Sequence, residues 1–141
     1  MRKYLFSLVA VLLLITGCGN ERKKLTCTME EDGTINEVKM EFGKNDNLTL
    51  ITMKMVKSFE KELTDDEVKL YENASSVACE QYPKESVECE ANVTKKELEL
   101  VVTYKIAKMT NEELSEAGYK KESATYDEMK KSAENSGFTC K

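Results

Sequence analysis

Five cysteines and no histidine limit the chemistry open to this 141-residue chain. Histidine is the commonest general base of enzymes and the commonest metal ligand, so neither role can be filled in the usual way. Cys18 directly follows an apolar segment near the N-terminus, whereas the other four cysteines are spread over the polar remainder: Cys27, Cys79, Cys89 and Cys140. The two groups therefore predict different chemistry.

The segment that precedes Cys18 has the composition of a secretory signal. Arg2 and Lys3 give it a positive start, and residues 5–15 are almost entirely apolar. A helix that crosses the hydrocarbon layer needs about 20 apolar residues, whereas a signal peptide has an apolar core of roughly 7–15. We therefore predict that residues 1–17 are an export signal and do not span the membrane.

The end of this segment, Leu14-Ile15-Thr16-Gly17-Cys18, resembles the lipobox of bacterial lipoproteins, with Ile15 where Leu is usual. The resemblance implies that the Cys18 thiol becomes a diacylglyceryl thioether and that cleavage before Cys18 removes the signal peptide. It also implies that the new N-terminus carries an acyl chain such as palmitate. Because two or more acyl chains hold a protein firmly at a bilayer, we expect a lipid-anchored protein of the cell membrane that faces the extracytoplasmic side. The alternative is an uncleaved short anchor with Cys18 as a free thiol.

The chain that follows the predicted signal is acidic. Residues 1–17 carry two basic and no acidic side chains, so their removal takes the formal net charge from −5 to −7. Such a charge works against the phosphates of a nucleic acid, and we expect no nucleic-acid binding. Residues 18–24 are predicted to be the lipidated cysteine and a short tether, and residues 25–141 a single domain.

Three basic residues lie in this tether, namely Arg22, Lys23 and Lys24. Residues 19–24 reach at most about 20 Å from Cys18, so the domain is expected to lie close to the lipid. Each basic group could then gain up to about 1 kcal/mol from anionic headgroups. The alternative is that these residues serve only as a soluble tether.

The other four cysteines form an even set in a chain predicted to be exported, which favours disulfide bonds. Cys27 lies in the first predicted strand and Cys140 is next to last in the chain, so a bond between them would close nearly the whole domain. Cys79 and Cys89 flank a turn and make a natural short-range pair. We predict Cys27–Cys140 and Cys79–Cys89, while the other two connectivities remain open. The chain has no C-x₂-C spacing of the kind that indicates zinc or a thiol oxidoreductase.

Alternating apolar residues predict an antiparallel sheet. Three strands are expected to form a meander, and two more a hairpin, within residues 25–29, 38–42, 48–55, 87–89 and 98–106. The apolar phase changes between Leu50 and Ile51, which predicts a bulge or a strand covered on both faces.

Three helices are predicted from capping boxes, in which a Thr is followed three residues later by a Glu: Thr64 with Glu67, Thr110 with Glu113, and Thr125 with Glu128. Thr94 and Glu97 have the same spacing, but strand patterns on both sides predict a hairpin turn there. We therefore expect an α+β fold in the order βββαββαα. In it, one long and two short helices pack on a curled antiparallel sheet of about five strands.

Two further groups of residues have a chemical and a structural interpretation. Met53 and Met55 place two thioethers on one face of a strand, which suits Cu(I), but methionine is also an ordinary core residue. The carboxylates of residues 65–67 and 112–113 lie at predicted helix starts, where the helix dipole favours negative charge. We assign both groups to structure, predict no metal, cofactor or catalytic residue, and expect that the protein is not an enzyme.

Taken together, these features resemble the YehR-like family of small bacterial lipoproteins. The resemblance rests on the lipobox at Cys18, the strand that ends at Phe59, the helix at Thr64, the hairpin of residues 87–108 and the closing sequence TYDEMKKSAENSGFTCK. It implies a fold and a location, and it implies no active site. We therefore expect a non-catalytic binding or interaction module of unknown partner; the alternative is a receptor for a solute or a metal.

Overall fold

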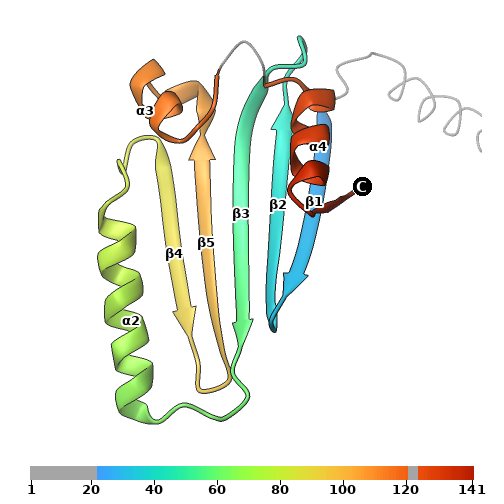
Figure 1. The fold of residues 1–141 in the computed structure, drawn as a ribbon. Helices are drawn as coiled ribbons and strands as arrows, with labels where there is room; N and C mark the ends of the chain where they lie inside the picture. Colours follow the sequence, from blue (N-terminus) through green and yellow to red (C-terminus); the bar gives the residue numbers. More distant parts are fainter. Residues whose placement is uncertain (1–21, 121–123) are drawn as a thin grey trace, which may run out of the picture.

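Six antiparallel strands form one open sheet in the order β4-β5-β3-β2-β1-β6 (Figure 1). This computed structural model describes residues 22–120 and 124–141, so the predicted signal peptide and Cys18 lie outside the described residues. The elements are β1 (Lys23–Glu31), β2 (Thr34–Phe42), β3 (Leu48–Ser58), α2 (Asp65–Glu80), β4 (Val87–Val93), β5 (Glu97–Lys105), η1 (Ile106–Lys108), α3 (Asn111–Glu116), α4 (Tyr126–Asn135) and β6 (Thr139–Cys140). The predicted α+β class and element order are confirmed, with the 3₁₀ turn η1 and the two-residue strand β6 in addition.

Two hairpin turns follow from local chemistry. Asp32 and Gly33 join β1 to β2 with φ angles of 49° and 72°, and two positive φ values give the turn whose twist suits a two-residue hairpin. Between β4 and β5, the backbone N–H of Thr94 donates to the carbonyl of Glu97 at 2.9 Å. The hydroxyl of Thr94 accepts from the N–H of Glu97 at 3.1 Å, so this segment is the predicted turn.

The phase change predicted in the third strand is a bulge. Glu41 of β2 pairs with Leu50 of β3, whereas its neighbour Phe42 pairs with Leu48, so Thr49 is left between them. The Thr49 hydroxyl donates to the carbonyl of Glu41 at 3.0 Å. The extra residue lets apolar side chains from both phases of β3 reach the same core.

The capping boxes predicted for α2 and α3 are complete. In each, the Thr hydroxyl accepts from the backbone N–H of the Glu three residues on, and the Glu carboxylate accepts from the Thr backbone N–H. In α4 the hydroxyl of Thr125 accepts from the N–H of Glu128, but the Glu128 carboxylate bonds to the Thr125 hydroxyl instead of its backbone. The third box is therefore half formed.

Strand register divides the sheet into two faces, because directly opposed residues share a face. One face, which we name the helix face, includes the row Cys27, Val38, Met53, Val102 and Cys89. The opposite face, which we name the charged face, carries the ion pairs Lys24–Glu41, Lys39–Glu37, Lys54–Glu99 and Lys105–Glu88. The polar residues of each strand therefore lie mainly on the side away from the helices.

The hydrophobic core lies on the helix face, beneath α4 and at the end of the sheet where α3 packs. Leu25, Cys27 and Phe42 are fully buried there, and Leu114 of α3 is 2% exposed. Tyr126 of α4 meets Phe42 edge to face, with ring centroids 5.5 Å apart. Burial of such side chains stabilises the fold by about 25 cal/mol per Å² of apolar surface.

The helices cover the helix face only in part. α4 lies over β1 and β2, whereas α2 runs alongside β4 at the edge of the sheet (Figure 1). This differs from the expectation that the long helix would cover the face. The loop of residues 81–86 is short, so α2 stays beside the strand that follows it, and none of its residues is buried. A strip of the helix face over β3 and β5 therefore remains open.

Both predicted disulfides are present. Cys27–Cys140 joins β1 to β6, and Cys79–Cys89 joins the last turn of α2 to β4. The first holds the C-terminus against the sheet, together with two backbone hydrogen bonds between Thr26 and Lys141. Within residues 22–120 and 124–141, no helix is long and apolar enough to cross a membrane.

Candidate functional site

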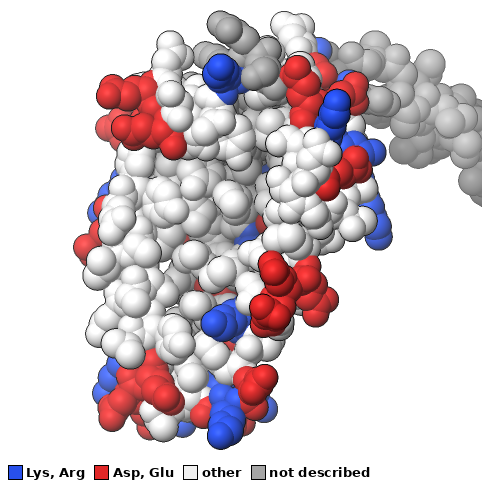
Figure 2. Space-filling model, viewed as in Figure 1, with Lys and Arg blue, Asp and Glu red and all other residues white. Residues whose placement is uncertain are grey.

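The open strip of the helix face is hollowed into a groove of about 380 Å³, which we name the sheet groove. Figure 2 shows this face, with mainly uncharged side chains between α2 and α4. The groove is formed largely by apolar side chains, which include Met53, Met55, Leu100, Val102 and Phe138. Its volume lies in the range of small-molecule sites, roughly 300–1,000 Å³.

Exposed apolar residues extend this surface. Met53 in the groove is 41% exposed, and on α2 Leu70 is 66% and Val77 58% exposed. At 3.6 residues per turn, Leu70, Ala74 and Val77 lie on one stripe of the helix. The charged residues beyond the first turn of α2 fall on the opposite half, and the side of α2 seen in Figure 2 is correspondingly uncharged.

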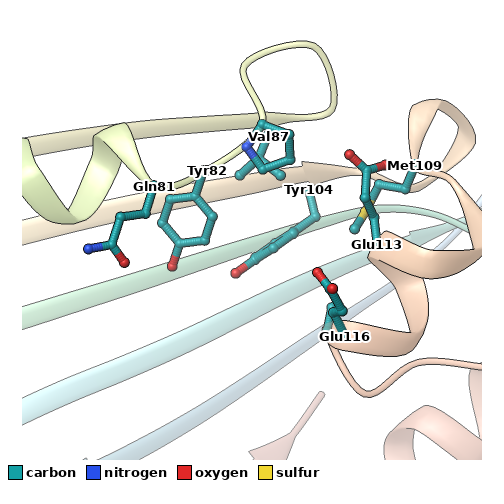
Figure 3. Close-up of a pocket in the computed structure, with 9 residues that line it drawn as sticks. Gln81, Tyr82, Val87, Tyr104, Met109, Glu113 and Glu116 are labelled. Atoms are coloured by element: carbon teal, nitrogen blue, oxygen red, sulfur yellow. The ribbon is translucent and has the colours of Figure 1, made fainter.

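A second cavity of about 300 Å³, which we name the tyrosine pocket, adjoins the sheet groove. Tyr82 and Tyr104 line both cavities, so they form the boundary between them. The other side of the pocket is made by Met109, Glu113 and Glu116 (Figure 3). Five parts of the chain contribute: the loop after α2, β4 through Val87, β5, the residue after η1, and α3.

The two tyrosines pack edge to face, with ring centroids 6.0 Å apart and an interplanar angle of 89°. Burial raises the pKa of Tyr104 to about 12, and its interaction with the Tyr82 hydroxyl adds to this. Burial also raises the pKa of the nearby Tyr119. At neutral pH the Tyr104 side chain is therefore uncharged, with an apolar ring and one polar group, its hydroxyl.

Glu113 is fixed in place by hydrogen bonds to both of its carboxylate oxygens. Oε2 accepts from the backbone N–H of Thr110 at 2.7 Å, which is the capping box of α3. Oε1 accepts from the hydroxyl of the buried Ser86 at 3.3 Å. Glu116, the last residue of α3, is exposed, and its carboxylate is turned toward the space in front of Tyr104 (Figure 3).

The residues predicted to contact lipid lie at the surface. Lys23 is 3.4 Å from Asp46 and Lys24 is 3.5 Å from Glu41, while Arg22 is exposed. β1 begins at Lys23, so two of the residues assigned to the tether belong to the sheet. The lipidation site Cys18 lies outside the described residues.

The two predicted thioethers face one cavity. Met53 and Met55 lie on the helix face and both line the sheet groove, where Met29 of β1 joins them. The carboxylates of residues 65–67 and 112–113 lie in the first turns of α2 and α3, as their assignment to capping predicts. In the part of the chain that the structure describes, no group of three or more His, Cys, Asp and Glu side chains could hold a metal ion.

The tyrosine pocket was not predicted from the sequence. The helix was predicted to run to Tyr82, but α2 ends at Glu80 and Tyr82 lies in the loop that follows. Tyr104 was assigned to a strand and Glu113 to a cap, and both of these assignments are correct. Residues from β5, α3 and the loop after α2 meet only in the tertiary structure. The only local signal was Tyr82 directly before Pro83, in the loop after α2.

The fold defines an α+β domain with an open antiparallel sheet, and comparison with known proteins supports that class. No protein-family model matches the chain, and no curated protein matches it either. The structure is similar to the NMR structure of the E. coli YehR protein, with a TM-score of 0.63 and 17% sequence identity over 87% of this chain and 93% of that chain. At this identity the similarity shows the fold alone, so the chain has a YehR-like fold.

Proposed function

We propose that this protein is a non-catalytic extracytoplasmic lipoprotein that binds an apolar ligand in the sheet groove. The observation that carries the proposal is the uncovered, solvent-open strip of apolar side chains between α2 and α4. Large apolar surfaces that remain exposed in a folded domain commonly mark binding sites. Covering them with a ligand is favourable by about 25 cal/mol per Å².

The proposed anchor is supported by the lipobox and by the start of the fold. β1 begins at Lys23, five residues after Cys18, so at most about 18 Å of chain separates the lipid from the sheet. Arg22, Lys23 and Lys24 are exposed at that point, and we propose that they contact anionic headgroups. The ion pairs of the two lysines at the surface are weak, so they would exchange readily for lipid phosphates.

The proposed non-catalytic role is also supported by the electrostatics. Each described group with a resolved shift has its pKa moved away from neutrality: Lys54 and Lys95 upward through their carboxylate partners, Asp65 and Glu67 downward, and Tyr104 and Tyr119 upward. A general acid or base needs a pKa near the working pH. These shifts instead keep each group in its ordinary charge state.

The anchor is tested by Cys18→Ser, with Asn20→Ser as a control close to the same cleavage site. Cells are grown with radioactive palmitate and then fractionated. We expect the Cys18→Ser chain to lose the palmitate label and to be absent from the membrane fraction as a mature, cleaved protein. The Asn20→Ser control should keep both the label and its mature form in the membrane fraction. Unchanged labelling and fractionation of Cys18→Ser would contradict the anchor.

The groove is tested with photo-crosslinking in native membranes. A dodecyl maltoside with a diazirine in its chain is the probe, and labelling of the full-length protein is measured by mass spectrometry. We expect Met53→Lys to reduce labelling at least fivefold, because a charged group in the groove costs more than about 1 kcal/mol to desolvate. Ile35→Lys is the matched control, because Ile35 is 46% exposed, close to the 41% of Met53, and lies on the charged face. Equal labelling of the two variants would refute the groove.

A second candidate is a Cu(I) receptor. The favouring observation is that a third thioether, Met29, lines the same groove as Met53 and Met55, and that Met53 is open to solvent. Soft thioethers select Cu(I). In a titration of Cu(I) against a chromophoric chelator, the protein should then bind one ion, and Met53→Leu should lose this binding. If the protein takes no more Cu(I) from the chelator than buffer does, this candidate is excluded.

A further inference from the structure

The tyrosine pocket has an unusual combination of charge and apolar surface. Two aromatic rings, Met109 and Val87 supply the apolar part, and Glu113 and Glu116 supply two carboxylates. No lysine or arginine is among the described residues that line the pocket. The cavity therefore carries negative charge that no neighbouring side chain of its lining neutralises.

This chemistry fits a large, weakly hydrated cation. A small divalent ion such as Ca²⁺ takes six to eight oxygen ligands, whereas this pocket offers two carboxylates, one of which already accepts two hydrogen bonds. An alkylammonium group needs no such shell, because it gains from the faces of aromatic rings and from nearby negative charge. Figure 3 shows the two tyrosine rings and the two carboxylates around one space.

The position of the pocket adds a second constraint on the ligand. Tyr82 and Tyr104 line both the pocket and the sheet groove, so the two cavities adjoin at these rings and one molecule that extends past them reaches both. The pocket lies at the end of the sheet where β1 begins, because Tyr104 pairs with Ile51 and Ile51 with Met40, near the start of β1. The combined site has two carboxylates at this end, and most of the residues that line the groove beyond them are apolar.

We propose that the ligand is an amphiphile with an organic ammonium head in the tyrosine pocket and an apolar chain in the sheet groove. This inference rests on the proposed function, in that the groove must accept an apolar chain. The charge complementarity of Glu113 and Glu116 selects the head. The apolar side chains of β3 and β5 contact the tail.

The test compares three photo-reactive probes that share a dodecyl chain with a diazirine and differ only in the head: trimethylammonium, maltoside and sulfate. Each is crosslinked to the full-length protein in native membranes. For each probe, labelling of a variant is divided by labelling of the unmodified protein, which cancels the different partitioning of the probes into lipid. Sites of attachment are then mapped by peptide mass spectrometry.

The critical variants are Glu116→Gln and Glu113→Gln. Glutamine at position 113 keeps the fold, because its amide oxygen can accept from the Thr110 backbone as in other capping boxes, and its amide NH₂ can donate to Ser86. Glu112→Gln is the matched control, because it removes the same charge from the same helix and does not line the pocket.

We expect each critical variant to lower ammonium-probe labelling about twofold to fivefold, as for a surface ion pair, and the double variant about tenfold. The maltoside probe and Glu112→Gln should show no change. Tyr82→Leu should weaken the ammonium probe about threefold through loss of the cation–π contact.

The outcomes separate the two proposals. If the ammonium and maltoside probes respond equally to Glu113→Gln and Glu116→Gln, the ammonium head is refuted and the apolar groove stands. If none of the three probes attaches to groove residues, the proposed function itself fails. A rise in the normalised labelling by the sulfate probe in Glu113→Gln and Glu116→Gln, together with a fall for the ammonium probe, would support the charge argument.

Discussion

Removal of the Cys27–Cys140 disulfide is expected to destabilise the protein more than removal of Cys79–Cys89. The two bonds join residues 113 and 10 positions apart. In the chain-entropy model these loops stabilise the fold by about 4.8 and about 2.7 kcal/mol respectively. The difference arises because closing the longer loop removes more conformational entropy from the unfolded chain.

The local structure also favours a large effect at Cys27. Its side chain is fully buried in the core, and β6 is otherwise held to β1 by the hydrogen bonds between Thr26 and Lys141. A domain of this size is stable by only about 5–15 kcal/mol. The variant Cys27→Ala with Cys140→Ala is therefore expected to lose a third or more of its stability and to release the C-terminus.

The assay is pulse proteolysis of the full-length protein in native membranes over a urea series. The variant Cys79→Ala with Cys89→Ala is the control, since it removes one disulfide and leaves the other. We expect the urea midpoint of the Cys27/Cys140 variant to fall about twice as far as that of the control. Equal midpoints, or a larger fall in the control, would refute the loop-length reasoning.

Three further predictions concern single residues. The phenol of Tyr104 should titrate near pH 12, later than ordinary tyrosines, and Tyr104→Phe should abolish this late phase in an ultraviolet titration. Because burial raises its folded pKa, the contribution of Tyr104 is fully present below pH 10 and is lost as the pH rises toward 12. Gly137, at the end of α4, has φ of 94°, so Gly137→Ala should cost about 1–2 kcal/mol in urea unfolding, and an unchanged midpoint would contradict this. The hydrogen bond from the Thr64 backbone lowers the pKa of Glu67 from 4.5, so its capping contribution is present above that pH and is lost as the pH falls through the lower folded value. Amide exchange at the start of α2 should therefore accelerate on acidification, and Glu67→Gln, which has no carboxylate to titrate, should remove the pH dependence.

Features that depend on neighbouring residues could be predicted from the sequence. The capping boxes of α2 and α3, the turn at Asp32 and Gly33 and the bulge beside Thr49 each follow from hydrogen bonds or φ preferences within a few residues. The disulfide pairing followed from strand order and the ends of the chain. The half-formed box at Thr125 was the exception, because a side-chain rotamer decides where the Glu128 carboxylate bonds.

Features that depend on packing between distant elements could not be predicted. The position of α2 at the sheet edge follows from the short loop to β4, which keeps the helix beside that strand, and no sequence periodicity predicts it. The two-residue strand β6 exists because Cys140 is bonded to β1, and a segment so short has no pattern of its own.

The sequence by itself predicts an export signal and a lipid anchor and determined the class of fold, because each of these depends on patterns of residues that are contiguous in the chain. The tertiary structure alone decided where the apolar surface stays open and which polar groups border it. Tyr82, Tyr104 and Glu116 meet only because β5, α3 and the end of α2 converge at one end of the sheet. The physical reason is that hydrogen-bonded local structure is fixed by short-range geometry, whereas a cavity is the space that long-range packing leaves unfilled.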